Sequence, residues 1–443
     1  MEETRKSLGQ LFVPICLETL FLMLAGMVDT LMLSSVSDQA VGAVGTSNTY
    51  ISIFLIMFYV ISMGMMAVMT QNIGANRQGV AWQARRLGIV FNCVVGVILS
   101  VVLFFFSGKI LAVMGIAASL QGDAESYLRI VGGSCLLPAL IPIFSGYLRA
   151  FGYTKQSLFA TVIANLLNVG LNALFLFGLD MGVAGVAIAT ALSRLVNLII
   201  LIVEAQLLVH AKEDDSRMND REIFGQIIRI GLPSAMETAL YQVAMILVVR
   251  FMNQMDAEGM NVTAKSYAIQ ITNFSYTVGA ALAQANAIMC GWRIGAREYD
   301  ACDKGTRRAA VLGIAVGAVL ESIFALCGGF LMRWFSDDPQ MVSLVCTLLA
   351  IDIVLEIGRV SNLVFGSALK TAGDALFPVV IGAVFMYLCA VGGTYLFGIR
   401  MGLLAVGAYI GLTLDECVRA VAMFLRWRSG KWKKMRLVRT EQE

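Results

Sequence analysis

The feature that most constrains the fold is a run of 38 residues, from Gln39 to Asn76, that contains no Lys, Arg, Asp or Glu. The hydrocarbon core of a bilayer is about 30 Å thick, so roughly 20 consecutive apolar residues suffice for one helical crossing. Comparable stretches recur along all 443 residues, and 58% of the chain is hydrophobic while only 14% is charged. This pattern excludes an ordinary soluble domain and predicts an all-α integral membrane protein.

Apolar segments of span length predict twelve transmembrane helices. Short loops that stay in the cytoplasm carry an excess of Lys and Arg. With both termini cytoplasmic, 24 of the 33 Lys and Arg fall on the cytoplasmic side and only six near the outer face. We therefore expect a multi-pass protein of the cell inner (plasma) membrane with both termini in the cytoplasm. The predicted helices cover residues 8–34, 46–73, 87–107, 122–147, 157–178, 182–208, 230–252, 264–291, 309–335, 340–368, 376–397 and 402–427.

Residues that build most catalytic and metal sites are scarce. The nine Cys include no Cys-x-x-Cys pair, and the single His, His210, lies in a central polar segment. Structural zinc centres need clustered Cys and His, and His is the commonest general acid or base. The sequence therefore predicts that the protein is not an enzyme and has no cofactor, no metal and no nucleic-acid partner.

The chain repeats itself once, at an offset of about 220 residues. Three separate stretches carry the similarity and stay in register, which chance would hardly produce. The first stretch has a Pro four residues before a Glu. The second is Ile-Gly-Ala, and the third begins with Leu and a basic residue and ends in Gly. The matches are Pro14–Thr19 with Pro233–Thr238, Ile73–Ala75 with Ile294–Ala296, and Leu148–Gly152 with Leu369–Gly373.

The repeat predicts how the chain is organised. Six crossings return the chain to its starting side, so the halves share one orientation and are related by a pseudo-twofold axis along the membrane normal. The polar segment from about 209 to 229 joins them, which gives an N-terminal lobe over residues 1–215 and a C-terminal lobe over 216–443. A transported solute is expected to bind in a cleft between the lobes.

Two acids lie inside the first predicted helix, where a charge at the bilayer centre costs about 2.5–3.5 kcal/mol. Glu18 and Asp29 are eleven residues apart, close to three helical turns, and so share one face. At an offset of 219 residues Glu237 matches Glu18, but Val248 matches Asp29, so the repeat alone does not require the Asp. We interpret Asp29 as a protonation or cation site, with a structural hydrogen-bond acceptor as the alternative. Glu18 and Glu237 either contact a solute or cation or satisfy neighbouring helix groups.

A second charged set lies in the tenth predicted helix. Asp352, Glu356 and Arg359 follow at i, i+4 and i+7 and share one face. We favour a structural ion pair between Glu356 and Arg359, and the alternative is that Asp352 and Glu356 contact a solute or a secondary cation. Asp415 and Arg419 form a similar pair at i and i+4 in the last predicted helix.

Taken together, these residues and motifs resemble the MATE family of multidrug and toxic compound exporters over essentially the whole chain. The resemblance rests on Val28-Asp29-Thr30, on Gly74 at the first basic loop, on Leu148–Gly152 and on Asn168–Ala191. It implies a V-shaped pair of six-helix lobes. It also implies alternating-access export of amphiphilic or cationic solutes against an inward flow of protons or sodium.

The resemblance places a coupling site in the N-terminal lobe. Its positions fall on Asp29, Asn168, Asn172 and Thr190. Asn172 stands where the family pattern has a carboxylate, so Asp29 is the one acid of the set. Hard cations favour charged oxygen ligands, so this departure favours H+ over Na+ as the coupling ion. Pro14 matches a proline at which the first helix bends in family members, and proline weakens a helix interior.

The sequence leaves alternatives open. The acid that the NorM branch carries in its C-terminal lobe falls on Tyr241, so Glu237 is not its equivalent. The alternative function is a lipid-linked oligosaccharide flippase of the same superfamily. Such flippases normally have extra helices or several cationic residues in the cavity, whereas this sequence predicts twelve helices and no excess of cavity Arg. A membrane-embedded transferase would need a His, paired-Asp or metal motif that we do not find. No motif names the solute, and we expect a monomer.

Overall fold

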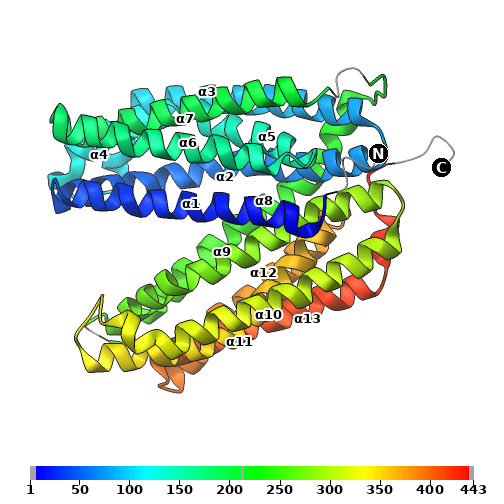
Figure 1. Ribbon diagram of the computed structural model, residues 1–443. Helices are drawn as coiled ribbons and strands as arrows, with labels where there is room; N and C mark the ends of the chain where they lie inside the picture. Colours follow the sequence, from blue (N-terminus) through cyan, green and yellow to red (C-terminus); the bar gives the residue numbers. More distant parts are fainter. Residues whose placement is uncertain (1–5, 211–213, 257, 439–443) are drawn as a thin grey trace. The chain divides into compact units, whose positions relative to one another are not determined.

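The structure is a computed structural model that describes residues 6–210, 214–256 and 258–438. In this part of the chain, helices follow one another through short loops (Figure 1). Residues 1–5 and 439–443, which carry the predicted cytoplasmic termini, lie outside the described residues.

The chain divides into two compact units. Unit 1 is Met1–Gly231 and unit 2 is Leu232–Glu443. The sequence predicts a boundary near residue 215, whereas the units divide inside a helix that begins at Asp220. The first turns of that helix belong to unit 1 because they pack on it: Phe224 contacts Phe91 with 5.8 Å between ring centroids, and Asp220 forms an ion pair with Arg86.

Unit 1 follows the predicted order of helices, several of which run beyond their predicted ends. These helices continue past the apolar core of the span into polar residues, which hydropathy alone does not register. In chain order they are α1 (Leu8–Ser34), α2 (Asp38–Gly74), α3 (Gln78–Val113), η1 (Ala118–Leu120), α4 (Gln121–Tyr127), η2 (Leu128–Gly132), α5 (Leu136–Ala150), α6 (Thr154–Ala173), η3 (Leu174–Gly178) and α7 (Gly182–Leu208).

Unit 2 begins within α8 (Asp220–Met252). The helices that follow again have predicted counterparts. They are α9 (Met260–Gly295), α10 (Tyr299–Met332), α11 (Pro339–Thr371), α12 (Leu376–Phe385), η5 (Met386–Val391), η6 (Thr394–Arg400), α13 (Leu404–Arg428) and η7 (Lys431–Lys434).

The protein is a multi-pass membrane protein, and nine of its described helices are long and apolar enough to cross a bilayer. A bent pair, α4–η2 with α5, would make a tenth. The prediction of one continuous helix over 122–147 is therefore wrong in detail, because the chain bends by 45° within it. Gly132 and Gly133 lie at the bend, pressed against Leu103 and Phe104 of α3. α9 and α13 are not among these helices, because polar or charged residues interrupt their apolar runs.

The repeated motif Leu148–Gly152, matched by Leu369–Gly373, ends a helix in the same way in both units. After α5, Gly152 adopts φ 85° and the Tyr153 amide donates to the Leu148 carbonyl over 2.8 Å. After α11, Gly373 adopts φ 101°, and the Asp374 amide donates to the Leu369 carbonyl over 2.9 Å. A left-handed residue closing a helix with this hydrogen bond is a Schellman turn, which glycine adopts without steric cost. The repeat of Leu148–Gly152 as Leu369–Gly373 is thus the repeat of a helix end.

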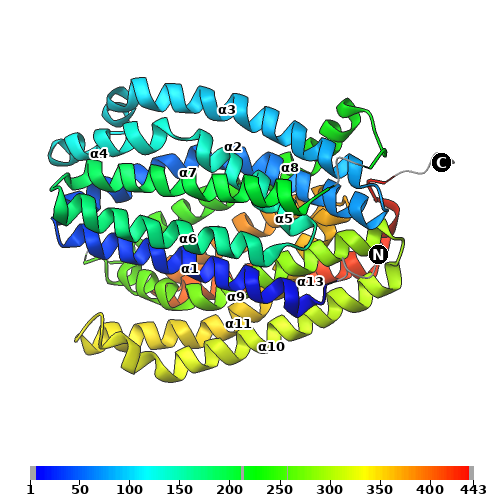
Figure 2. The ribbon, with the colours of Figure 1, turned by 45° about the horizontal axis from the view of Figure 1, so that its top comes forward.

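Packing within each unit decides which side chains meet. In unit 1, α6 lies beside both α1 and α7, as the two ribbon views show (Figures 1 and 2). In unit 2, α11 packs against α9, α10 and α13. Ser157, Thr161 and Asn172 of α6 contact acids of α1 where these two helices pack.

A close backbone contact in unit 1 joins α2 to the start of α8. A Cβ on Gly64 would overlap the carbonyl of Ile227, and a Cβ on Gly231 would overlap the carbonyl of Val60. The two helices can approach this closely only because both positions are glycine.

Candidate functional site

The first candidate site surrounds Asp29 on α1. The Asn172 side-chain nitrogen donates to Asp29 Oδ1 over 2.7 Å. The Asn168 side chain also forms hydrogen bonds with this carboxylate when its amide is oriented with the nitrogen towards Asp29. The nitrogen then lies 2.8 Å from Oδ1 and 3.3 Å from Oδ2. Both Asn are buried on α6, four residues apart, so they share the face that packs on α1. Three of the four residues predicted for the coupling site therefore meet.

The fourth residue, Thr190, uses its hydroxyl differently. The hydroxyl donates to the Val186 carbonyl within α7 over 2.9 Å. Arg194, one turn further along α7, exerts an electrostatic attraction on Asp29. Pro14 is buried within α1, which runs as one helix from Leu8 to Ser34. The predicted bend at Pro14 stays a prediction.

The Asp29 site suits a carboxylate that exchanges a proton. Two amide N–H groups face it, and such donors stabilise the ionised acid. The Asn172 oxygen is buried and has no hydrogen-bond partner, so the site also holds an unused acceptor. A sodium ion would need several oxygen ligands, whereas both amides present nitrogen to the acid.

Glu18 lies at the other end of the same helix face, in an ion pair. Its Oε1 accepts hydrogen bonds from Arg149 Nη2 at 2.7 Å, Ser157 Oγ at 3.0 Å and Thr161 Oγ1 at 3.1 Å. Glu18 is 3% exposed. These side chains form one local network, which links α1 to α5 and α6.

Glu237 forms the corresponding ion pair in unit 2, with 2.5 Å between Glu237 Oε2 and Lys370 Nζ. Lys370 stands in the repeated Leu148–Gly152 motif where unit 1 has Arg149. This geometry favours a structural role for Glu18 and Glu237 over contact with a solute or a cation.

The charge pairs predicted for unit 2 are confirmed. Arg359 Nη1 lies 2.9 Å from Glu356 Oε2, and Arg419 Nη2 lies 2.7 Å from Asp415 Oδ2. Asp352, on the same face of α11, is buried at 2% exposure and its Oδ2 has no hydrogen-bond partner.

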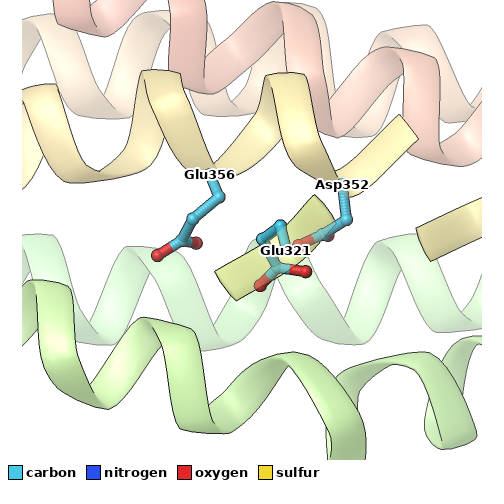
Figure 3. A group of neighbouring side chains, drawn as sticks. All are labelled: Glu321, Asp352 and Glu356. Atoms are coloured by element: carbon cyan, nitrogen blue, oxygen red, sulfur yellow. The ribbon is translucent and has the colours of Figure 1, made fainter. Parts of the chain in front are cut away.

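Glu321 on α10 is the residue that sequence reasoning missed. One ligand oxygen each of Glu321, Asp352 and Glu356 lies within 4.8 Å of the others, and all three side chains are buried (Figure 3). This is the one group of three or more His, Cys, Asp or Glu side chains able to hold a metal ion within the described ranges. The sequence does carry a signal for it, because Glu321 is an acid inside the apolar predicted helix 309–335, as Asp29 is in the first.

Comparison with known proteins gives consistent matches over the whole chain. The family model described as MatE matches residues 14–174 and 233–396. The "Uncharacterized transporter YisQ" of Bacillus subtilis is 33% identical over 432 residues, covering 96% of this chain and 94% of the relative. The "Probable multidrug resistance protein NorM" of Thermotoga maritima is 26% identical over 457 residues, covering 99% and 96%.

The fold also matches solved structures. One, titled "Outward-facing conformation of a multidrug resistance MATE family transporter of the MOP superfamily", aligns with a TM-score of 0.87 at 20% identity, covering 98% of this chain and 96% of that chain. At this identity the likeness concerns the fold alone.

Proposed function

Because the chain belongs to the MATE family of multidrug efflux transporters, we propose that it exports amphiphilic or cationic solutes in exchange for protons bound at Asp29. MATE transporters bind small drug-like ligands and are not enzymes. The observation that carries the choice of ion is the contact of Asp29 with two amides in place of a second carboxylate.

Proton exchange at this site would change the hydrogen bonds between α1 and α6. Ionised Asp29 accepts from Asn172 and Asn168, whereas a protonated Asp29 becomes a donor and needs an acceptor. The unpartnered oxygen of Asn172 supplies that acceptor once its amide rotates. Protonation also removes the negative charge that attracts a cationic solute. Both effects favour release of the solute when protons enter from outside.

Other functions receive less support. A flippase for lipid-linked oligosaccharides would carry a cavity rich in Arg, whereas in unit 1 the hydrogen bonds to the site carboxylate come from two amides. The relative from Bacillus subtilis is named an uncharacterized transporter, so its name does not single out a solute. The proposed unit of transport is a monomer in the plasma membrane, since each site described lies within one unit of one chain.

Solute flux in proteoliposomes tests the proposal. With ethidium loaded inside, efflux is expected to accelerate when the outside is made acidic and to stay unchanged when sodium is added outside at constant pH. The physical reason is that Asp29 has no second carboxylate to share a sodium ion. Acceleration by sodium alone, with none from acid, would contradict proton coupling.

The orientation of the chain gives a second prediction. The Lys and Arg distribution requires the 209–229 segment and the carboxyl terminus to face the cytoplasm. A reporter active only in the cytoplasm, inserted next to Arg217 or fused after Glu443, is expected to be active at both positions. A reporter active only outside the membrane should be silent at both, and the reverse pattern would exclude the predicted topology.

A further inference from the structure

We propose that Cys290 and Cys302 form a redox-sensitive thiol pair, which a peroxide converts into a disulfide that ties α9 to α10. Their Sγ atoms lie 3.0 Å apart. Both cysteines are free thiols and both are buried, each at 1% exposure. The proposal concerns unit 2 alone and goes beyond the proposed function, on which it does not depend.

A tight turn between the two helices holds the thiols together. The Glu298 amide donates to the Arg293 carbonyl over 2.8 Å and closes the end of α9. The Arg293 side chain then reaches α10, where its Nη1 donates to the Ala301 carbonyl over 2.8 Å. Cys290 and Cys302 stand on either side of this turn, so its hydrogen bonds fix the positions of the two sulfur atoms relative to each other.

The internal repeat shows that this turn does not need cysteines. In unit 1, Asn76 adopts φ 60° where unit 2 has Arg297 at φ 61°, an offset of 221 residues. At the same offset the two cysteines correspond to Met69 and Ala81, which are both buried at 0% exposure and carry no thiol. Packing of the repeated turn therefore does not explain why unit 2 has a thiol at both positions.

The geometry suits a disulfide better than a bound metal ion. A disulfide joins sulfur atoms about 2.05 Å apart, so a side-chain movement of about 1 Å would close the bond. A structural zinc ion needs four ligands. Within the described ranges, neither cysteine belongs to a group of three or more His, Cys, Asp or Glu side chains that could hold a metal ion.

The reaction balances with a peroxide as the oxidant. One sulfur, as its thiolate, attacks an oxygen of hydrogen peroxide and breaks the O–O bond, which leaves a sulfenic acid and one water. The second sulfur attacks the sulfenic sulfur and displaces its oxygen as a second water. The two thiols lose two protons and two electrons in total, and the peroxide is reduced to two waters. A dithiol reductant reverses the bond by thiol–disulfide exchange.

Burial determines which product forms. Because solvent rarely reaches the two thiols, the first step is slow and the pair stays reduced until peroxide accumulates. Once a sulfenic acid has formed, the partner sulfur is already in contact with it, so the disulfide forms before a second peroxide can oxidise the same sulfur further. The bond then closes the short loop from Cys290 to Cys302 and resists separation of α9 from α10.

Peptide mapping of the full-length protein in proteoliposomes tests the pair. Trypsin cleaves after Lys and Arg, which places Cys290 in the peptide 266–293 and Cys302 in the peptide 298–304, each as its one cysteine. After treatment with hydrogen peroxide and blocking of the remaining thiols with N-ethylmaleimide, we expect to find these two peptides joined. Dithiothreitol added before the N-ethylmaleimide should return them as separate alkylated peptides.

Two variants separate this pair from the other thiols. Cys302→Ala introduces the residue that unit 1 has at the equivalent position, so it is expected to fold and to lose the joined peptides completely. Cys389→Ala removes another buried thiol of unit 2 and should give them at the wild-type yield. If Cys302→Ala does not fold, Cys290→Met, which copies Met69 of unit 1, replaces it.

Three results would each overturn the proposal. The first is that both wild-type peptides stay separate after peroxide, with their thiols unoxidised. The second is a disulfide from Cys290 to a cysteine other than Cys302. The third is oxidation of either sulfur to a sulfinic acid without a bond to its partner.

Discussion

Asp29→Asn is expected to abolish proton-driven export while leaving folding and membrane insertion intact. The substitution keeps the size of the side chain and removes the group that gains and loses the proton. The amide can still form hydrogen bonds with Asn168 and Asn172, so the α1–α6 contact should survive. We expect ethidium efflux under a pH gradient to fall by about tenfold or more, which is a usual size for coupling between two sites.

Glu204→Gln is the matched control, because it neutralises another acid of unit 1 that forms no ion pair in the described chain. It should export at the wild-type rate. If Asp29→Asn exports ethidium at the wild-type rate under the same gradient, Asp29 is not the coupling site. The buried acids Glu321, Asp352 and Glu356 are then the next candidates. Equal expression and equal elution of both variants on gel filtration would show that a loss of efflux is not a loss of folding.

Gly231→Ala is expected to destabilise unit 1 strongly. The added Cβ would overlap the Val60 carbonyl, which is backbone and cannot move aside as a side chain can. Overpacking of this kind costs about 1–3 kcal/mol or more, because α2 and α8 must separate. We expect a lower thermal midpoint and a lower yield of folded protein.

Gly225→Ala lies six residues earlier on the same helix, where a Cβ would meet nothing within 4 Å. Alanine is favoured over glycine in a helix by about 1 kcal/mol, so this control should be neutral or stabilising. If both variants unfold at the same temperature, the close approach of α2 and α8 is not important for stability.

Much of the fold could be predicted because its signals are local. Apolar runs mark the helices, and the repeated Gly152 and Gly373 mark the turns that end two of them. The ends of the helices could not be read, since α3 and α10 continue for many residues past the apolar run. The bend after η2 was missed as well, because it depends on how two glycines pack against α3.

Within the candidate sites, the sequence predicted contacts between residues on one helix better than contacts between residues on different helices. The Glu356–Arg359 pair lies three residues apart on one helix, so helical periodicity predicts it. The partner of Glu18 is Arg149, on another helix, and periodicity within a helix cannot reveal such a contact. Asn172 was placed beside Asp29 through the family resemblance, and the structure has them in contact.

The ion pairs Glu18–Arg149 and Glu237–Lys370 have an evolutionary consequence. Two halves that keep the same pair in the same motif are what a gene duplication leaves. The other acids have diverged since: at the 221-residue spacing of Arg149 and Lys370, Asp352 and Glu356 fall on Val131 and Cys135. The two halves thus share one scaffold, and each carries ionisable groups of its own. A chain made of two copies of the first half would have this ion pair in each half and would lack Glu321, Asp352 and Glu356.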